Sequence, residues 1–311
     1  MPTSDADADA GSDAVADDRE TTTTGVRPHG ELVFDDDLQR QVYEFVEHHG
    51  AVTESELIRS TRLETDDTQS KPARSGAYTH EVVPAPGEIR AAVESLVSRR
   101  YLTDTGDRIR LALSAPPRTV ECESGTVTLR PVEEGDRRAL LETMRSVARD
   151  GSYVVAASLA DRVEADSAVV RTRGDRSRIC FVATLDERDN GGQTTRDNRG
   201  EAPATDDEST VVGWFHLEAP SHPAQSHTAS VTVGVDPAVR RQGLGSALLE
   251  YGQAWATEQG FRKLGQGVPA TNDGAIEFLE AHGWEREGER RDQYRIDEAF
   301  VDELLLATCL D

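Results

Sequence analysis

A strand that runs directly into a helix, within residues 228–259, constrains the fold of this chain more than any other stretch. Val231, Val233 and Val235 alternate with small or polar residues, which is the period of two of a half-buried β-strand. Pro237 ends the strand, because proline has no amide hydrogen for a sheet ladder. Apolar side chains then recur at helical spacing: Leu244, Leu248, Tyr251 and Trp255. The pattern predicts a strand and a helix that pack together.

The junction between the two elements, residues 240–245, reads Arg-Arg-Gln-Gly-Leu-Gly. Gly243 and Gly245 let the backbone approach a ligand closely, and the first-turn amides of a helix have no partner within the helix. These amides point outward with the positive end of the helix dipole, so the junction suits a phosphate, and Arg240 and Arg241 add charge. The alternative is a turn that uses glycine only for tight packing.

A second motif at residues 272–284 reads as a helix opened by Asn272 and closed by Gly283. The valine-rich strand, Asp-Pro, Arg-x-x-Gly-x-Gly and this Asn-x-x-Ala-Ile-x-Phe helix resemble the two signatures of the GCN5-related N-acetyltransferase (GNAT) family, in the family's order and spacing. The resemblance covers residues 125–296. It implies the GNAT acyl-CoA N-acyltransferase fold, a mixed α/β sheet in which two neighbouring strands splay around the pantetheine arm of acetyl-CoA.

The resemblance also implies which residues bind acetyl-CoA, with no metal taking part. Backbone amides at 233–235 pair with the pantetheine arm and polarise the thioester carbonyl, amides at 241–246 hold the diphosphate, and Asn272 contacts the cofactor arm. The full predicted set is Val233, Gly234, Val235, Arg240, Arg241, Gln242, Gly243, Leu244, Gly245, Ser246 and Asn272.

Proton handling departs from the family's pattern. Many members carry a glutamate on the key strand, where this chain has Ser230 and Thr232, and a tyrosine where this chain has Leu279. The remaining candidates are His227, at the start of the key strand, and His216 and Glu218, which share one face of the preceding strand. Histidine titrates near neutrality and could accept a proton through water. Taken singly, each histidine is more often a surface or core-edge residue than a catalytic one.

Acidic residues number 58 against 34 basic ones, which gives a formal net charge of -24, and Lys71 and Lys263 are the only lysines. An acidic surface with little lysine indicates a halophile's cytoplasm, although an acidic protein from a high-GC genome fits as well. The charge argues against broad attraction to nucleic acid or membrane at low salt. Three scattered cysteines give neither a disulfide framework nor metal-ligand spacing. We find no membrane-length apolar run and no signal peptide.

The chain before the GNAT-like part divides by composition. Residues 1–30 predict a disordered acidic tail, and residues 31–114 predict three short helices and a hairpin that resemble a winged helix, with a capping box at Thr53. A DNA-binding domain would place the third helix in a major groove and Arg108 or Arg110 at the wing. The segment carries more acid than base, so a docking or dimerising domain is favoured over DNA contact.

Residues 115–124 predict a linker, and residues 125–311 predict the transferase domain. Within this domain we expect helices from Asp136 and at 158–171, and strands at 126–130, 178–185, 210–217 and 264–268. The residues at 186–209 predict a disordered surface insertion. A hairpin over 284–296 and a helix at 298–307 complete the expected layout.

The sequence therefore predicts a cytoplasmic N-acetyltransferase in which an amine acceptor attacks acetyl-CoA directly in a ternary complex. The first alternative is an acetyl-CoA-responsive winged-helix transcription regulator with a non-catalytic transferase domain. A scaffold protein with a vestigial phosphate loop is a third. The sequence does not name the acceptor, which can be a small molecule or a protein N-terminus or lysine, and it leaves a homodimer open.

Overall fold

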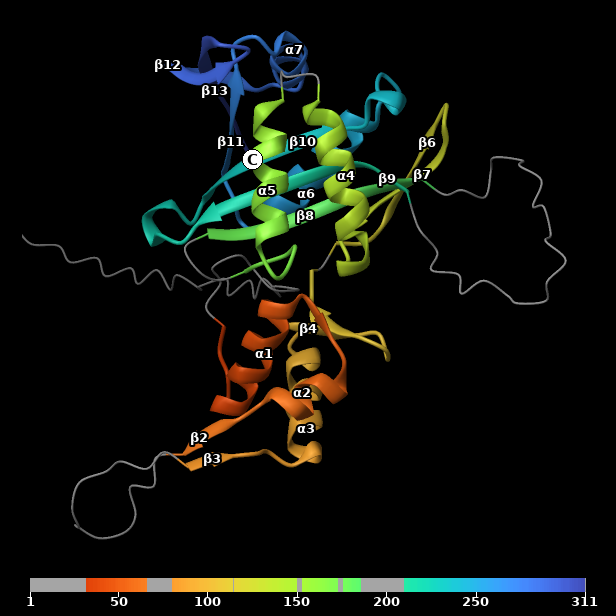
Figure 1. The fold of residues 1–311 in the computed structure, drawn as a ribbon, viewed down its shortest axis with the longest axis vertical. Helices are drawn as coiled ribbons and strands as arrows, with labels where there is room; N and C mark the ends of the chain where they lie inside the picture. Colours follow the sequence, from red (N-terminus) through yellow and green to blue (C-terminus); the bar gives the residue numbers. More distant parts are fainter. Residues whose placement is uncertain are drawn as a thin grey trace, which may run out of the picture.

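The computed structural model describes residues 32–65, 80–113, 115–149, 153–172, 176–185 and 210–310. The predicted tail (1–30) and surface insertion (186–209) lie outside the described residues. The described residues form a small N-terminal body and a larger body around an eight-stranded sheet (Figure 1).

The N-terminal body combines three helices with short strands, in the order α1 (Asp37–His49), β1 (Ala51–Val52), α2 (Glu54–Ser60), β2 (Leu63–Thr65), β3 (His80–Val82), α3 (Pro86–Ser98), β4 (Leu102–Asp104) and β5 (Ile109–Leu111). Strands β1, β5 and β4 form a sheet in that order, and β2 pairs with β3. The capping box predicted at the start of α2 is confirmed, since Glu56 N donates to the Thr53 hydroxyl and Thr53 N donates to the Glu56 carboxylate. Side chains from all three helices form its core: Val42, Tyr43, Val46, Leu57, Ile89 and Leu96.

The larger body is built on one mixed sheet with the strand order β12-β13-β11-β10-β9-β8-β7-β6. Its strands are β6 (Arg118–Cys122), β7 (Gly125–Pro131), β8 (Arg176–Leu185), β9 (Thr210–Pro220), β10 (Thr228–Val235), β11 (Lys263–Pro269), β12 (Glu285–Ile296) and β13 (Ala299–Cys309). All neighbouring strands are antiparallel except β10 and β11. Its helices are α4 (Arg137–Ala148), α5 (Val154–Ala165), α6 (Leu244–Glu258) and α7 (Asp273–Ala281).

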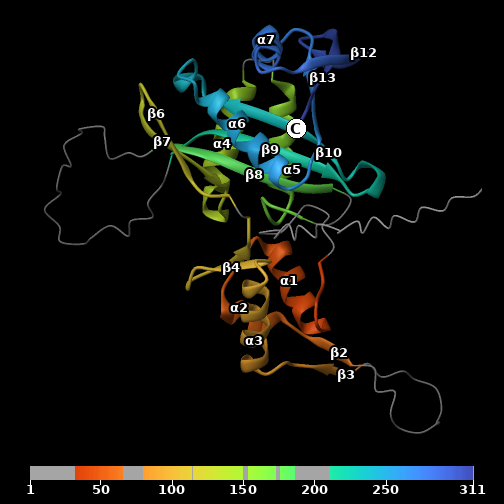
Figure 2. The same ribbon diagram turned by 180° about the vertical axis from the view of Figure 1, so that it is seen from behind.

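The two faces of the sheet carry different helices. Helices α4 and α5 lie in front of the sheet in Figure 1, and α6 lies on the opposite face, seen in Figure 2. Because successive side chains of a strand point to opposite faces, Trp214 packs toward α4 and α5 while its neighbour Phe215 packs toward α6. This alternation decides which strand residues can meet a ligand on each side.

The predicted C-terminal helix at 298–307 is wrong, because these residues lie in strand β13. The run Leu304-Leu305-Leu306-Ala307 has high intrinsic helix propensity. In the sheet, however, β13 pairs with β11 on one side and with β12 on the other. Hydrogen-bond partners on both edges and burial of Leu306 outweigh the local preference.

Three further predictions differ from the structure. The hairpin expected over 284–296 is the single strand β12, and its hairpin partner is β13. Strand β6 lies inside the segment 115–124 that was expected to be a linker, and it pairs with β7 as the edge of the large sheet. The helix expected at 158–171 is α5, which begins at Val154 and ends at Ala165. Helix α5 ends early because Arg137 binds backbone oxygens at its C-terminal end. The guanidinium donates to the oxygen of Val163, in the last turn, and to that of Ser167, just after the helix.

Candidate active site

The parallel strands β10 and β11 pair over only part of their length. Their paired residues are Thr228–Ser230 and Lys263–Gly265. Strand β10 continues to Val235 and β11 to Pro269, and each still pairs with its outer neighbour, β9 or β13. The two strands therefore separate beyond Ser230 and Gly265. Backbone groups that face this split have no strand partner among the described residues, and an extended ligand would satisfy them.

The split leads to the loop before α6, where a cavity of about 390 Å³ opens. Gly243 has φ 80° in the left-handed region and directly precedes α6, and Arg241 has φ 66°. This backbone path turns the first amides of α6 outward, where helix ends attract anions. The cavity is lined by Tyr153, Val233, Gly234, Val235, Val239, Arg240, Arg241, Gly243, Gly245, Ser246, Gly274, Ala275 and Phe278.

Arg240 is held in place at the cavity wall. Its Nε donates to the backbone oxygen of Val235 at 3.0 Å, and its guanidinium carbon lies 5.1 Å from the centre of the Tyr153 ring. The cation–π contact joins the start of α5 to the loop before α6. The arrangement fixes one positive charge beside the outward-facing amides of the loop.

Helix α7 closes the cavity from the other side. Asn272 accepts a hydrogen bond from Ala275 N at 3.1 Å and is thereby the N-cap of this helix. His282 follows the helix, with Nδ1 2.7 Å from the backbone oxygen of Phe278 and Nε2 2.9 Å from the Ser246 hydroxyl. A carbonyl only accepts, so Nδ1 carries the proton and Nε2 accepts from Ser246. This bond joins α7 to α6 beside the cavity.

The structure brings eight of the eleven predicted cofactor residues to this cavity: Val233, Gly234, Val235, Arg240, Arg241, Gly243, Gly245 and Ser246. The other three side chains have structural contacts elsewhere. Gln242 exchanges hydrogen bonds with Ser124, Leu244 is buried in the core, and Asn272 caps α7. Sequence reasoning missed Tyr153, Val239, Gly274, Ala275 and Phe278. Of these, Ala275 and Phe278 belong to the Ala-Ile-x-Phe motif, which could have indicated both.

The structure places His216 in the core beneath α4 and α5. The residue is 2% exposed, and neither ring nitrogen has a hydrogen-bond partner among the described residues. Burial, together with the positive charges of Arg178 and Arg162, lowers the pKa of His216 from 6.5 to about 3. The imidazole is therefore neutral at any working pH and is a weak base.

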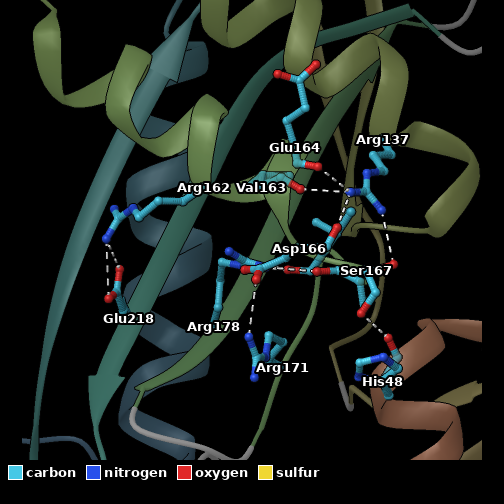
Figure 3. A network of polar contacts seen from close by, with 12 residues as sticks. His48, Arg137, Arg162, Val163, Glu164, Asp166, Ser167, Arg171, Arg178 and Glu218 are labelled. Carbon is cyan, nitrogen blue, oxygen red and sulfur yellow. Dashed lines mark hydrogen bonds and ion pairs between the residues drawn. The ribbon is translucent and has the colours of Figure 1, made fainter.

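Glu218 and His227 lie apart from the split. Glu218 accepts from Arg162 at 3.0 Å (Figure 3) and from Arg176 at 3.1 Å, so its carboxylate is engaged in two ion pairs. His227 lies exposed in the turn before β10, at the end where β10 and β11 are paired. Five residues of strand separate it from Thr232, which is about 16 Å. The structure does not bring the three predicted proton-handling residues together.

Within the described part of the chain, no group of three or more His, Cys, Asp or Glu side chains could hold a metal ion. None of the helices described there is long and apolar enough to span a membrane.

A strand split, a glycine-rich helix start and a capped second helix thus surround one cavity. Residues 171–284 match the model of the acetyltransferase (GNAT) family. This GNAT segment contains the split, the glycine loop and α7, and it indicates an acyltransferase domain. No curated protein matches the chain in a sequence search.

Solved structures resemble about three fifths of the chain. A GNAT-family acetyltransferase from Streptococcus pneumoniae has 20% identity and a TM-score of 0.42, over 59% of this chain and 99% of that chain. The ribosomal-protein-S18-alanine N-acetyltransferase of Escherichia coli has 20% identity and a TM-score of 0.40, over 60% and 94%. A Salmonella typhimurium structure that contains its cofactor acetyl-CoA has 17% identity and a TM-score of 0.43, over 60% and 94%.

Proposed function

We propose that the chain is an N-acetyltransferase that transfers the acetyl group of acetyl-CoA to a primary amine, by direct attack in a ternary complex. The observation that carries this proposal is the split between β10 and β11, which ends at the glycine loop before α6. Acetyl-CoA is a thioester with a long amide-containing arm and a diphosphate. The arm needs an open strand edge and the diphosphate needs an anion site at the end of that edge, and both features are present.

The chemistry of the residues around the split also supports acetyl-CoA. Gln266 lies on β11 where the strands have separated, and its side-chain oxygen is buried with no hydrogen-bond partner among the described residues. A buried acceptor of this kind is costly unless a ligand donates to it, and the pantetheine arm contains two amide N–H groups. The outward amides of residues 241–246 and the fixed charge of Arg240 suit the diphosphate.

When bound, acetyl-CoA supplies an activated acyl thioester. The backbone amides at 233–235 hold its carbonyl oxygen, because hydrogen-bond donors placed where negative charge develops stabilise the transition state. Gly234 suits this position for a structural reason as well: a Cβ there would lie 2.1 Å from the Trp214 ring. The Trp214 ring thus occupies the space beside Gly234 that a side chain would fill.

Release of free thiol from acetyl-CoA tests the proposal. The purified full chain should release coenzyme A in molar KCl when a panel of primary amines is added, and much less without an amine. Calorimetry should detect coenzyme A binding at the same salt. A folded sample that does not bind coenzyme A would overturn the assignment.

For the N-terminal body we propose a winged-helix-like docking domain. Its element order and its β1-β5-β4 sheet support this fold. DNA contact is not favoured, because Arg110, expected at the wing, forms an ion pair with Glu133 of the larger body. The exposed side of α3 is also mixed in charge, with Glu88 and Glu94 beside Arg90, and Arg90 pairs with Glu54.

The contact between the two bodies favours a second candidate, the acetyl-CoA-responsive regulator. Thr172, 1% exposed, donates its hydroxyl to the Glu47 carboxylate at 2.6 Å and its backbone N–H to the same oxygen at 2.8 Å. Because that hydroxyl proton is used, Tyr43 donates to Thr172 at 2.7 Å. Ser167 donates to the backbone oxygen of His48 (Figure 3). Helix α1 is thereby joined to the connection between α5 and β8 in the larger body. Binding to genomic fragments that changes with acetyl-CoA would favour the regulator.

We expect Thr172→Val to weaken the coupling between the two bodies by about 1–3 kcal/mol, because it removes the hydroxyl that accepts from Tyr43 and donates to Glu47. Differential scanning calorimetry at fixed salt should show the N-terminal body unfolding before the larger body in this variant. Thr308→Val on β13 is the control, since its hydroxyl makes only a marginal 3.5 Å contact. A single unshifted transition in Thr172→Val would contradict the coupling.

We also propose that the protein works in the cytoplasm of a halophile of the haloarchaeal type. The net charge of -24 and the two lysines in the whole sequence support this. Folding and activity should then require molar KCl, because dense carboxylates repel one another when they are not screened.

A further inference from the structure

A carboxylate that the proposed mechanism does not use lies beside the split, on the sheet face that α4 and α5 cover. Strand β11 alternates between the faces: Leu264 and Val268 pack in the cluster with α6, so Gly265 and Gly267 face the side of α4 and α5. Glu303 on β13 is paired with Pro269 and shares this second face. On β10, Thr232 and Gly234 face the same way, across the split.

The carboxylate of Glu303 reaches over β11 toward the split. A Cβ added to Gly267 would lie 2.0 Å from Glu303 Oε1 and 2.7 Å from its Cδ. The glycine therefore leaves the space in which the carboxylate lies, directly above the strand that borders the split. Any larger residue at 267 would displace the carboxylate from this position.

Two neighbours on β12 hold the carboxylate there. Tyr294 donates its hydroxyl to Oε1 at 2.5 Å, and Arg290 donates to Oε2 at 2.7 Å. Burial, followed by the contact with Glu303, raises the pKa of Tyr294, so the phenol stays protonated and keeps donating. Glu303 itself is 6% exposed. A carboxylate can accept about four hydrogen bonds, so two positions remain for a ligand.

We propose that Glu303 binds the ammonium group of the acceptor and receives its proton. This inference rests on the proposed acetyltransferase function and assigns its missing acid–base residue. It also names the acceptor class: an aliphatic amine that is charged at neutral pH, as opposed to an aromatic amine that is neutral there. Glu218 also lies on this face and was a candidate from the sequence. Its carboxylate, however, forms ion pairs with two arginines.

The proposed acetyl transfer conserves atoms, electrons and charge. The ammonium group loses one proton to the Glu303 carboxylate, and the nitrogen lone pair forms the new C–N bond to the acetyl carbon. The C–S bond breaks and its electron pair leaves on sulfur as the thiolate of coenzyme A. After attack, the acetylated nitrogen still carries one proton more than the amide product. That proton passes through solvent to the thiolate and neutralises it. No oxidant, reductant or metal is needed.

The test compares Glu303→Gln with wild type, using spermidine, L-lysine amide and a tetrapeptide with a free N-terminus as charged probes, and aniline as the neutral one. Wild type should acetylate at least one charged probe and leave aniline unchanged. At pH 7, Glu303→Gln should lower kcat/KM for that probe by about 100-fold, the range of general-base catalysis. The dissociation constant of acetyl-CoA, measured by calorimetry, should not change.

The pH profile separates proton transfer from structural damage. Toward pH 10 the amine is neutral in solution and no longer needs a base, so the defect of Glu303→Gln should shrink there. Damage to the fold would lower activity at every pH. Tyr294→Phe keeps the charge of Glu303 but removes one donor, and it should raise KM for the amine several-fold without altering acetyl-CoA binding. This second variant tests the site even if Glu303→Gln folds poorly.

Glu289→Gln is the matched control, because Glu289 lies on the neighbouring strand β12 and is paired with Leu304, on the opposite face. It should behave like wild type. Glu303→Gln with kcat/KM within threefold of wild type at pH 7 overturns the proposal, as does acetylation of aniline in preference to the charged probes. Failure to acetylate any charged probe while acetyl-CoA still binds also overturns it. Loss of acetyl-CoA binding by wild type would instead contradict the proposed function itself.

Discussion

Coenzyme A should bind the Gly243→Val variant about 100-fold more weakly than wild type, as measured by calorimetry in molar KCl. Gly243 has φ 80°, a conformation that costs an L-residue about 1–2 kcal/mol and a β-branched residue more. No atom lies within 4 Å of a Cβ at this position, so the cost comes from the backbone and not from a clash. Valine should shift the loop toward negative φ and turn the amides at the start of α6 away from the diphosphate.

Gly260→Val provides a matched control at the other end of the same helix. Gly260 has φ 85°, and a Cβ there would also meet nothing within 4 Å. The two variants should lose similar stability, because they carry the same backbone strain. Only Gly243→Val should lose coenzyme A binding, since α6 places Gly260 about 22 Å away from the loop. Equal affinity in the two variants would mean that the loop does not hold the ligand.

The parts of the site that the sequence predicted are those that depend on short segments. The strand, the Arg-x-x-Gly-x-Gly loop and α6 are consecutive, so period and glycine spacing specify them without any knowledge of the rest of the chain. Because these elements are consecutive, eight predicted cofactor residues meet at one cavity. The capping box at Thr53, in the N-terminal body, is equally local and was predicted for the same reason.

The parts that the sequence did not predict depend on contacts between distant segments. Tyr153 reaches the cavity only because α5 begins beside Arg240, and no motif near residue 153 indicates this. Glu303 was assigned to a helix, since the leucine run that follows it has high helix propensity. Its place over Gly267 follows from the pairing of β13 with β11, which local propensity does not contain.

Sequence also could not separate a catalytic histidine from a buried one. His216 and Glu218 share a face of β9, as the alternation predicted, and in the structure that face lies on the side of α4 and α5. What the pattern does not contain is how completely those helices cover the ring, or that Arg162 and Arg176 hold Glu218. Burial turns His216 from a candidate base into a group that resists protonation.

That resistance predicts a pH dependence of stability. The folded-state pKa of His216 is lowered to about 3, below the value of about 6.5 in the unfolded chain. As pH falls through 6.5 the unfolded chain takes up a proton that the folded chain refuses, so the free energy of unfolding decreases until about pH 3. Between pH 7 and pH 5 the loss from this one residue should be about 2 kcal/mol.

His216→Leu should remove that loss. Guanidinium unfolding followed by tryptophan fluorescence should show a variant at least as stable as wild type at pH 7, because the ring nitrogens of His216 are buried and make no hydrogen bond within the described residues. Between pH 7 and pH 5 the advantage of the variant should grow by about 2 kcal/mol, while carboxylates that titrate in both proteins cancel in the difference. His227→Leu, which removes an exposed histidine, should follow wild type. If His216 instead received the acceptor's proton, His216→Leu would lose thiol release at pH 7, so the same variant decides between a buried core residue and a catalytic one.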